Sequence, residues 1–158
     1  MAETRGIREL RAAGIEHRVL TYRYTGSGPV AEEAATALGV EPERLFKTLV
    51  WVVDERPVLA LVPADDELAP KRLAAAAGGK HAAIADRKLA ERVSGYQIGG
   101  ISPLGSRQRL LVFLDDSALA YESVCLNAGG RGVIVEVATA DLVAHTGAVT
   151  ASLGRAQS

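Results

Sequence analysis

One stretch decides the fold of this chain: Phe46-Lys47-Thr48-Leu49-Val50-Trp51-Val52-Val53. Alternation along a strand places Phe46 and Val50 on one face, and Leu49 and Trp51 on the other. Both faces are apolar, and a strand of this kind lies inside a sheet with cover on both sides. We therefore expect residues 46–53 to form a central strand, with Lys47 near its start as the exception to its apolar character.

Outward from this strand, turns and apolar periodicity predict the other elements. We expect strands at residues 16–22, 58–62, 81–84, 110–114, 122–127 and 132–137. We expect helices at residues 3–13, 30–38, 67–77, 87–92 and 140–145. Asp86 and Thr139 are predicted to cap the last two helices, and the tail from Gly154 is predicted to fray. Adjacent hairpins among alternating helices and strands predict an α+β fold, with a mixed sheet flanked by helices.

Length and composition indicate one globular domain. The chain has 158 residues, of which 48% are hydrophobic and 23% charged. No apolar run has the length of a signal peptide core or a membrane span. The single cysteine, Cys125, excludes an internal disulfide and fits a reducing cytoplasm. Its apolar neighbours predict a buried hydrophobe rather than a nucleophile. We expect a single domain over residues 1–158, located in the cytoplasm and without a membrane partner.

The charge is unevenly distributed, although the net charge is only −1. Residues 71–109 hold eight basic residues against two acids, which gives +6, and the rest of the chain holds ten against 17, which gives −7. A local positive field favours an anionic ligand, such as a few phosphates. Chance clustering on a solvated surface is the alternative.

The basic segment contains a glycine-rich run, Gly95-Tyr96-Gln97-Ile98-Gly99-Gly100-Ile101-Ser102-Pro103-Leu104-Gly105. Glycines permit close approach to the main chain and the proline shapes the loop, so main-chain N–H groups here could bind a polar ligand. A plain helix-to-strand connection is the alternative. The second glycine-rich run, Asn127 to Gly132, reads either as a hairpin turn or as a loop that presents Arg131 to a phosphate.

Other site types lack their sequence signals. His17, His81 and His145 have no metal-ligand spacing, and the chain has no P-loop, dinucleotide fingerprint or serine-hydrolase elbow. Asp115-Asp116 reads as a turn after a strand rather than as a metal site. We expect neither a metal nor a cofactor.

Three stretches together resemble the YbaK family: Phe46-Lys47-Thr48, the run from Gly95 to Gly105, and Asn127 to Gly132 with Asp141-Leu142 beyond. This family is related to the editing insertion domain of bacterial prolyl-tRNA synthetases, and the likeness covers about residues 5–150. It implies an α+β domain with a barrel-like mixed sheet. It also implies a free-standing deacylase of mischarged tRNA, with the tRNA acceptor end as partner and prolyl-tRNA synthetase as a further partner to be tested.

The resemblance also implies the roles of individual residues. Lys47 is the expected catalytic residue, at the terminal adenosine or the ester. The expected substrate-binding residues are Tyr22, Phe46, Thr48, Gly99, Gly100, Ile101, Ser102, Pro103, Asn127, Gly129 and Arg131. Since no protein nucleophile is evident, the implied chemistry is substrate-assisted, with the thiol of a misacylated cysteine attacking its own ester.

The sequence departs from the cysteine-specific branch just after the second glycine run. That branch is expected to carry an aspartate where this chain has Val133 and Ile134. Cys-tRNA(Pro) is the first expected substrate, and alanine or serine on tRNA is the alternative. A non-catalytic module that binds tRNA or a synthetase is the second hypothesis, and a nucleotide-binding domain without a tRNA role is the third.

Overall fold

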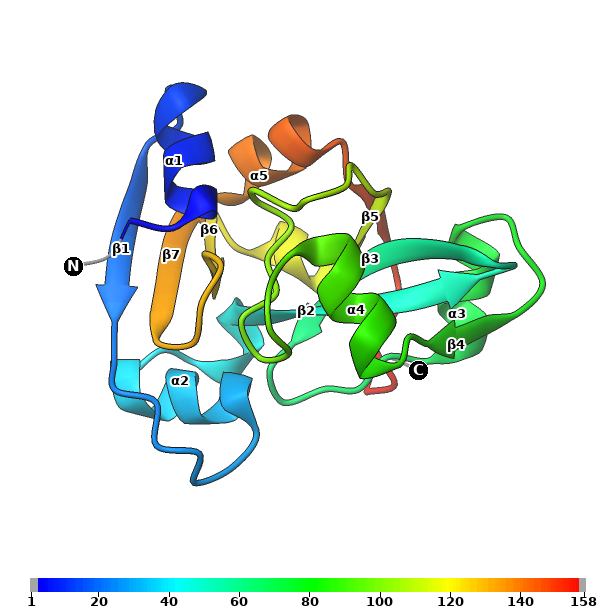
Figure 1. The fold of residues 1–158 in the computed structure, drawn as a ribbon, viewed down its shortest axis with the longest axis horizontal. Coiled ribbons are helices and arrows are strands. Elements are labelled where there is room, and N and C mark those ends of the chain that lie inside the picture. Colours follow the sequence, from blue (N-terminus) through cyan, green and yellow to red (C-terminus); the bar gives the residue numbers. More distant parts are fainter. Residues whose placement is uncertain (1–2, 157–158) are drawn as a thin grey trace.

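The computed structural model describes residues 3–156, whose strands form one mixed eight-stranded sheet (Figure 1). The strand order is β1-β7-β6-β2-β3-β5-β8, and β4 pairs with β2 beside this path. The strands are β1 (His17–Thr21), β2 (Leu45–Val53), β3 (Arg56–Pro63), β4 (Ala82–Ile84), β5 (Val112–Asp115), β6 (Ser123–Asn127), β7 (Val133–Ala138) and β8 (Val149–Ala151). The helices are α1 (Arg5–Ala12), α2 (Val30–Leu38), α3 (Pro70–Ala76), α4 (Arg87–Ser94) and α5 (Thr139–Thr146), with short 3-10 helices η1 (Pro42–Arg44) and η2 (Asp116–Ala120).

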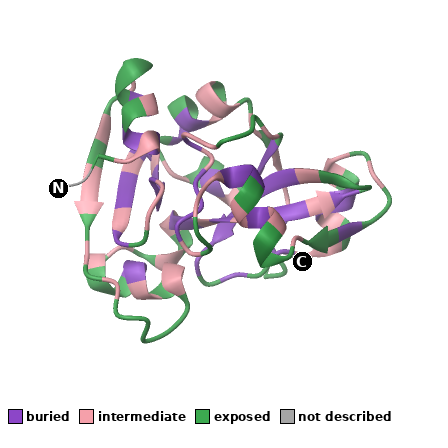
Figure 2. Ribbon diagram, viewed as in Figure 1, coloured by how far each residue is buried: buried purple, intermediate pink, exposed green. Residues whose placement is uncertain are grey.

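The strand β2 lies at the centre of the sheet, as predicted. It pairs with β3 and β4 in antiparallel fashion and with β6 in parallel fashion. Phe46 and Val50 belong to one core cluster, and Trp51 and Val53 belong to a second cluster on the other face. In Figure 2 the buried residues, in purple, are concentrated along β2 and β3. Phe46 is fully buried, which contributes about 1.5–3 kcal/mol to folding.

Both predicted hairpins are confirmed. The strands β2 and β3 pair from Phe46 opposite Pro63 to Val53 opposite Arg56, and β6 pairs with β7. Parallel pairs also occur between β3 and β5 and between β5 and β8. The α+β class with a mixed sheet is therefore confirmed. Within residues 3–156 the pairing path runs from β1 to β8 without closing on itself.

One predicted helix cap is confirmed and the other is wrong. The Asp86 carboxylate accepts a hydrogen bond from the Leu89 amide at 2.8 Å, as an N-cap does. Thr139, in contrast, is the first residue of α5, and Ala138 occupies the cap position. The Thr139 hydroxyl donates to the Tyr121 carbonyl at 2.7 Å instead, because a long-range acceptor lies within its reach.

Two predictions near the C-terminus are also wrong. The helix expected from residue 67 begins only at Pro70, because Leu68 pairs with Gly154 as an isolated bridge. The first residues of the tail, 154–156, do not fray: the Gly154 amide donates to the Asp115 carboxylate at 3.0 Å, and the Arg155 amide donates to the Glu67 carbonyl at 2.7 Å. The last two residues of the predicted tail lie outside the described part of the chain. These partners are distant in sequence, so local composition gave no signal of them.

The strand β8 was not predicted. It has three residues and lies at the edge of the sheet, where it pairs in parallel with β5. Val149 on this strand is 45% exposed, so the strand has no apolar alternation from which it could be recognised.

Candidate functional site

A cavity of about 270 Å³ lies beside the start of β2. It is enclosed by α2, α4, the first half of β2 and the loop after α4, which passes in front of the sheet in Figure 1. The lining is largely apolar and comprises Tyr22, Pro29, Val30, Ala31, Ala34, Leu45, Phe46, Lys47, Thr48, Leu49, Val50, Ala64, Ile84, Ala85, Ala90, Ile98, Gly99, Ile101, Asn127 and Ile134. The central strand thus supplies one wall, and its neighbours hold that wall rigidly.

Two hydroxyl groups in this apolar lining have no partner among the described residues within hydrogen-bond distance. The Thr48 hydroxyl is buried and forms no hydrogen bond with any residue from 3 to 156, and the buried Tyr22 hydroxyl has at most a weak contact with the Gly132 main chain. Burial raises the pKa of Tyr22, so its hydroxyl stays protonated and able to donate. An unsatisfied buried hydroxyl costs about 1–3 kcal/mol, so a ligand that pairs with it recovers that free energy. Lys47 lines the same cavity and has no ion pair in the described part of the chain.

The two glycine-rich loops meet at the edge of this cavity. The Asn127 amide oxygen accepts from the Gly129 and Gly130 amides at 2.7 and 3.0 Å. The Asn127 amide nitrogen donates to the Gly99 carbonyl at 3.3 Å, and the Gly130 amide donates to the Gly100 carbonyl at 3.1 Å. A Cβ on Gly100 would lie 3.0 Å from the Gly130 Cα, so glycine permits this close approach.

Several main-chain donors remain free in the first loop. The Gly100 amide donates to Gln97 and the Leu104 amide to Ser102, whereas the Gly99 and Ile101 amides have no partner within residues 3–156. Gly99 and Ile101 both line the cavity. Two unpaired amides therefore lie where they could stabilise negative charge on a bound carbonyl.

Seven of the predicted site residues line this cavity, and five do not. The seven are Tyr22, Phe46, Lys47, Thr48, Gly99, Ile101 and Asn127. The remaining five are Gly100, Ser102, Pro103, Gly129 and Arg131. Segments up to 105 residues apart in sequence thus converge on one cavity, from Tyr22 to Asn127.

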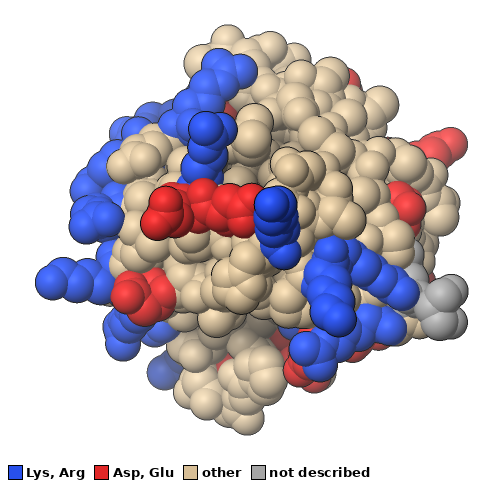
Figure 3. Space-filling model, turned by 90° about the vertical axis from the view of Figure 1, so that its right-hand side faces the viewer, with Lys and Arg blue, Asp and Glu red and all other residues tan. Residues whose placement is uncertain are grey.

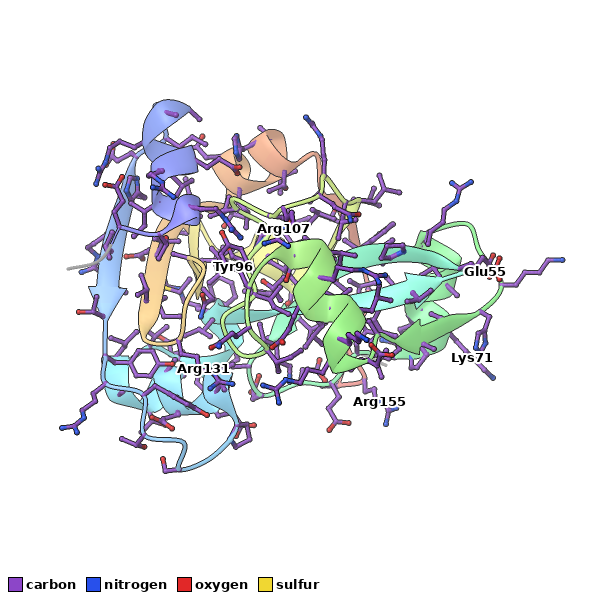
Figure 4. The ribbon with its side chains drawn as sticks, viewed as in Figure 1. Glu55, Lys71, Tyr96, Arg107, Arg131 and Arg155 are labelled. Carbon is purple, nitrogen blue, oxygen red and sulfur yellow. The ribbon has the colours of Figure 1, made fainter. Side chains whose placement is uncertain are left out.

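The five residues outside the lining have other surroundings, and most of them contact the loops. Ser102 is completely buried, and its hydroxyl accepts from the Leu104 amide at 3.1 Å. Gly129 lies against the Tyr96 ring, and Pro103 lies at a different cleft. The Arg131 guanidinium donates to the Ile98 carbonyl at 2.8 and 3.1 Å and stacks over Tyr24 at 5.2 Å. In Figure 4 Arg131 lies between α2 and the glycine loop.

Sequence reasoning missed the apolar lining residues other than Phe46 and Ile101. Val30 and Ala34 come from α2, and Ile84 and Ile98 come from β4 and the loop. Ile84 is 63% exposed and Ile98 is 39% exposed. The only signal in the sequence was a large apolar residue, Ile98, directly before the glycine pair, and an isolated exposed apolar residue is common in any protein.

The helix α1 fastens both glycine loops from behind the cavity. The Thr4 hydroxyl donates to the Ala128 carbonyl at 2.6 Å. The Arg5 guanidinium donates to the Gly95 and Gly105 carbonyls at 3.1 and 3.0 Å, and its carbon lies 4.5 Å from the centre of the Tyr96 ring. These contacts hold the loop in shape without occupying its free amides.

Other chemistries have little support in the geometry. Within residues 3–156 no cluster of three potential metal ligands occurs, and no helix is long and apolar enough to cross a membrane. Cys125 is buried, and this burial raises its pKa to about 11, so it is a core residue as predicted.

Known proteins resemble this chain over most of its length. A family model described as an aminoacyl-tRNA editing domain matches residues 26–144. EbsC of Enterococcus faecalis, named as a candidate Cys-tRNA(Pro)/Cys-tRNA(Cys) deacylase, is 32% identical over 145 residues, which cover 91% of this chain and 88% of EbsC. The proline–tRNA ligase of Geobacter metallireducens is 35% identical over 83 residues, 52% of this chain but 15% of the ligase.

A solved structure agrees with these relatives. It is described as a candidate trans-editing enzyme for prolyl-tRNA synthetase and superposes with a TM-score of 0.81 at 27% identity, covering 98% of this chain and 99% of that chain. The resemblance to the YbaK family and the expected class of enzyme, an aminoacyl-tRNA editing deacylase, are thereby confirmed. This chain belongs to the aminoacyl-tRNA editing domain family.

Proposed function

We propose that this protein acts in trans on mischarged tRNA and that its substrate is Cys-tRNA(Pro). The observation that carries the proposal is the small apolar cavity in which Lys47 and the free amides of Gly99 and Ile101 come together. A cysteine side chain is small and behaves as a hydrophobe with a weak S–H donor, which suits such a cavity. The names of EbsC and of the trans-editing structure support the same substrate.

In the proposed reaction, the amides and the lysine at the cavity each have a separate role. The substrate's own sulfur attacks its ester carbonyl carbon, a C–S bond forms, and the carbonyl oxygen becomes an oxyanion. The amides of Gly99 and Ile101 stabilise that oxyanion. Collapse breaks the bond to the ribose oxygen, which receives the thiol proton, and a cyclic thiolactone leaves. Lys47 binds the ester or the terminal adenosine as a cation, and the protein contributes chiefly by positioning.

The wall of the cavity also bears on the choice of amino acid. Ile134 lies in the lining, and the cysteine-specific branch is expected to carry an aspartate where this chain has Val133 and Ile134. An apolar wall favours cysteine or alanine over serine, whose hydroxyl would lose hydration without gaining a partner there. Alanine has no thiol, so Ala-tRNA(Pro) would require attack by water.

The test is hydrolysis of a panel of charged tRNAs. Cys-, Ala- and Ser-tRNA(Pro) are compared with Pro-tRNA(Pro) and Cys-tRNA(Cys). Wild type is compared with Lys47→Ala, and Lys71→Ala is the control because Lys71 is an exposed lysine on α3. We expect Cys-tRNA(Pro) to be cleaved fastest, and Lys47→Ala to lose about 100-fold in kcat/KM, because the ester is then no longer held in position for attack.

Three results would overturn parts of this proposal. If Ala-tRNA(Pro) were cleaved faster than Cys-tRNA(Pro), the proposed substrate would be wrong and alanine would take the place of cysteine. Full activity of Lys47→Ala would remove Lys47 from the site. Binding of charged tRNA without cleavage of any member would establish the non-catalytic binding module instead.

A further inference from the structure

A second cleft, of about 350 Å³, lies on the opposite side of the glycine loop. The first half of the loop, at Ile98 to Ile101, faces the apolar cavity, whereas Pro103 and residues 106–110 line this second cleft. The helices α1 and α5 contribute Glu9 and His145. Figure 3 shows Lys and Arg side chains gathered on its left, and that side is the front of the molecule in Figure 1, where α4 and this loop lie before the sheet.

Unpaired donors converge in this cleft. Arg107 and Arg109 are exposed, and within residues 3–156 their guanidinium groups have no ion pair. The Ser106 hydroxyl oxygen is buried there and forms no hydrogen bond with any described residue. An unpaired buried hydroxyl in the same cleft as two guanidinium groups without ion pairs calls for an acceptor that bears negative charge.

The one acid in the cleft is already engaged. One carboxylate oxygen of Glu9 accepts from the Gly105 amide at 3.0 Å, and the other pairs with His145 at 2.9 Å. Glu9 therefore holds the loop and the imidazole in place, and both of its carboxylate oxygens already have partners. The remaining charge of the cleft is positive, from Arg107 and Arg109.

We propose that this cleft binds backbone phosphates of the tRNA acceptor stem while the aminoacyl end occupies the apolar cavity. The inference rests on the proposed function, and it extends the substrate contact to the far side of the glycine loop. Arginine matches phosphate through a planar fork of donors, and the Ser106 hydroxyl adds a third donor. A tRNA that enters both sites grips the loop from two sides, so the stem positions the ester beside Lys47.

The binding experiment uses uncharged tRNA and does not depend on catalysis. The double variant Arg107→Ala/Arg109→Ala is compared with Arg56→Ala/Lys71→Ala, which removes the same charge. Figure 4 shows Lys71 and the β2–β3 turn at Glu55 far from Arg107. We expect the slope of log affinity against log salt to become shallower by about 2 in the first variant, since each lost phosphate contact removes about one unit, and to stay unchanged in the control. Equal slopes in the two variants would overturn the proposal.

The kinetic experiment separates this site from the catalytic one. For Arg107→Ala/Arg109→Ala we expect KM for charged tRNA to rise about tenfold at unchanged kcat, and Ser106→Ala to raise it about twofold to threefold. Hydrolysis of a cysteine ester of adenosine, which lacks a stem, should be unaffected. An equal loss on both substrates would show that the arginines act on the loop rather than on the stem, and would overturn the proposal.

Free phosphate has the same chemistry and needs its own measurement. Tight calorimetric binding of pyrophosphate that is lost in Arg107→Ala/Arg109→Ala, together with unchanged tRNA affinity, would assign the cleft to a free anion and overturn the tRNA assignment. Should no ester be cleaved by any variant, the proposed function falls, but the salt slopes still decide whether the cleft binds tRNA.

Discussion

The two hollows on either side of the glycine loop differ in how they can recognise a ligand. The cavity beside β2 is mostly apolar and has few polar groups, among them Thr48 and Lys47. Such a lining suits a small ligand that carries a single polar group. The cleft beside α5 is lined by Arg107, Arg109 and His145, with an unpaired Ser106 hydroxyl. The first can select by size and shape, whereas the second can select only by charge.

The glycine loop lines both hollows, and contacts with other parts of the chain hold its main chain in place. Arg5 and Glu9 from α1 hold the main chain at Gly95 and Gly105, and Asn127 holds it at Gly99. The loop between these anchors needs no internal helix or strand. The difference between the hollows comes partly from the loop itself, which presents Ile98 and Ile101 to the cavity and Arg107 and Arg109 to the cleft.

The largest expected effect comes from Gly100→Ala, which separates the two glycine loops. The added Cβ would lie 3.0 Å from the Gly130 Cα and 3.1 Å from the Arg131 amide, and neither main-chain atom can move alone. We expect deacylation kcat/KM to fall about 100-fold, since a displacement near 1 Å is enough for such a loss. Gly28→Ala is the control, because open space surrounds that position. Normal activity of Gly100→Ala would show that loop contact is not needed.

A smaller effect is expected from Thr48→Val, which removes an unpaired hydroxyl and keeps the shape of the side chain. The free energy of unfolding should stay the same or rise by about 1 kcal/mol, because no hydrogen bond is lost. Deacylation should fall about tenfold if the hydroxyl pairs with substrate. Denaturant unfolding and kinetics on the same sample check this, with Thr48→Ser as the hydroxyl-retaining control. Unchanged kinetics of Thr48→Val would show that the Thr48 hydroxyl does not bind the substrate.

Glu136→Gln should alter stability without altering either hollow. The Glu136 carboxylate accepts from Ser123 at 2.8 Å and pairs with Arg18 and Arg44, and these contacts lower its pKa to about 2. Folding therefore favours the ionised carboxylate. Its contribution is present above the ordinary pKa of 4.5 and is lost as pH falls from there through about 2.

At pH 7 we expect Glu136→Gln to lower the free energy of unfolding by about 1 kcal/mol. The gap between variant and wild type should narrow as the pH falls below 4.5 in urea titrations. A gap that is constant with pH would contradict the ionic origin, and deacylation should be unchanged at neutral pH.

The smallest effect on activity is expected from Cys125→Ala. Burial and the raised pKa of about 11 leave no reactive thiolate at neutral pH, so deacylation should match wild type. Stability should fall by about 1 kcal/mol from the lost packing. Abolished turnover in a folded Cys125→Ala sample would require a protein nucleophile and would contradict the substrate-assisted route.

Local sequence was sufficient for the elements whose signals are local. The strand β2 is apolar on both faces, α2 starts after Pro29 and ends at Gly39, and Asp86 caps α4. Such patterns depend on neighbours within a few residues. Where a distant partner competes, the same reasoning failed: Thr139 bonds to Tyr121, and Leu68 pairs with Gly154.

The candidate site divides in the same way. By itself the sequence determined the strand that carries Lys47, the two glycine loops and, through its resemblance, the editing family. Only the tertiary structure decided that Tyr22, Thr48 and Gly99 share a cavity, that Pro103 faces away from it, and that Ser106 and Arg109 line a second cleft. The physical reason is that side-chain direction in an irregular loop depends on contacts such as those of Arg5 and Asn127, which join residues far apart in the chain.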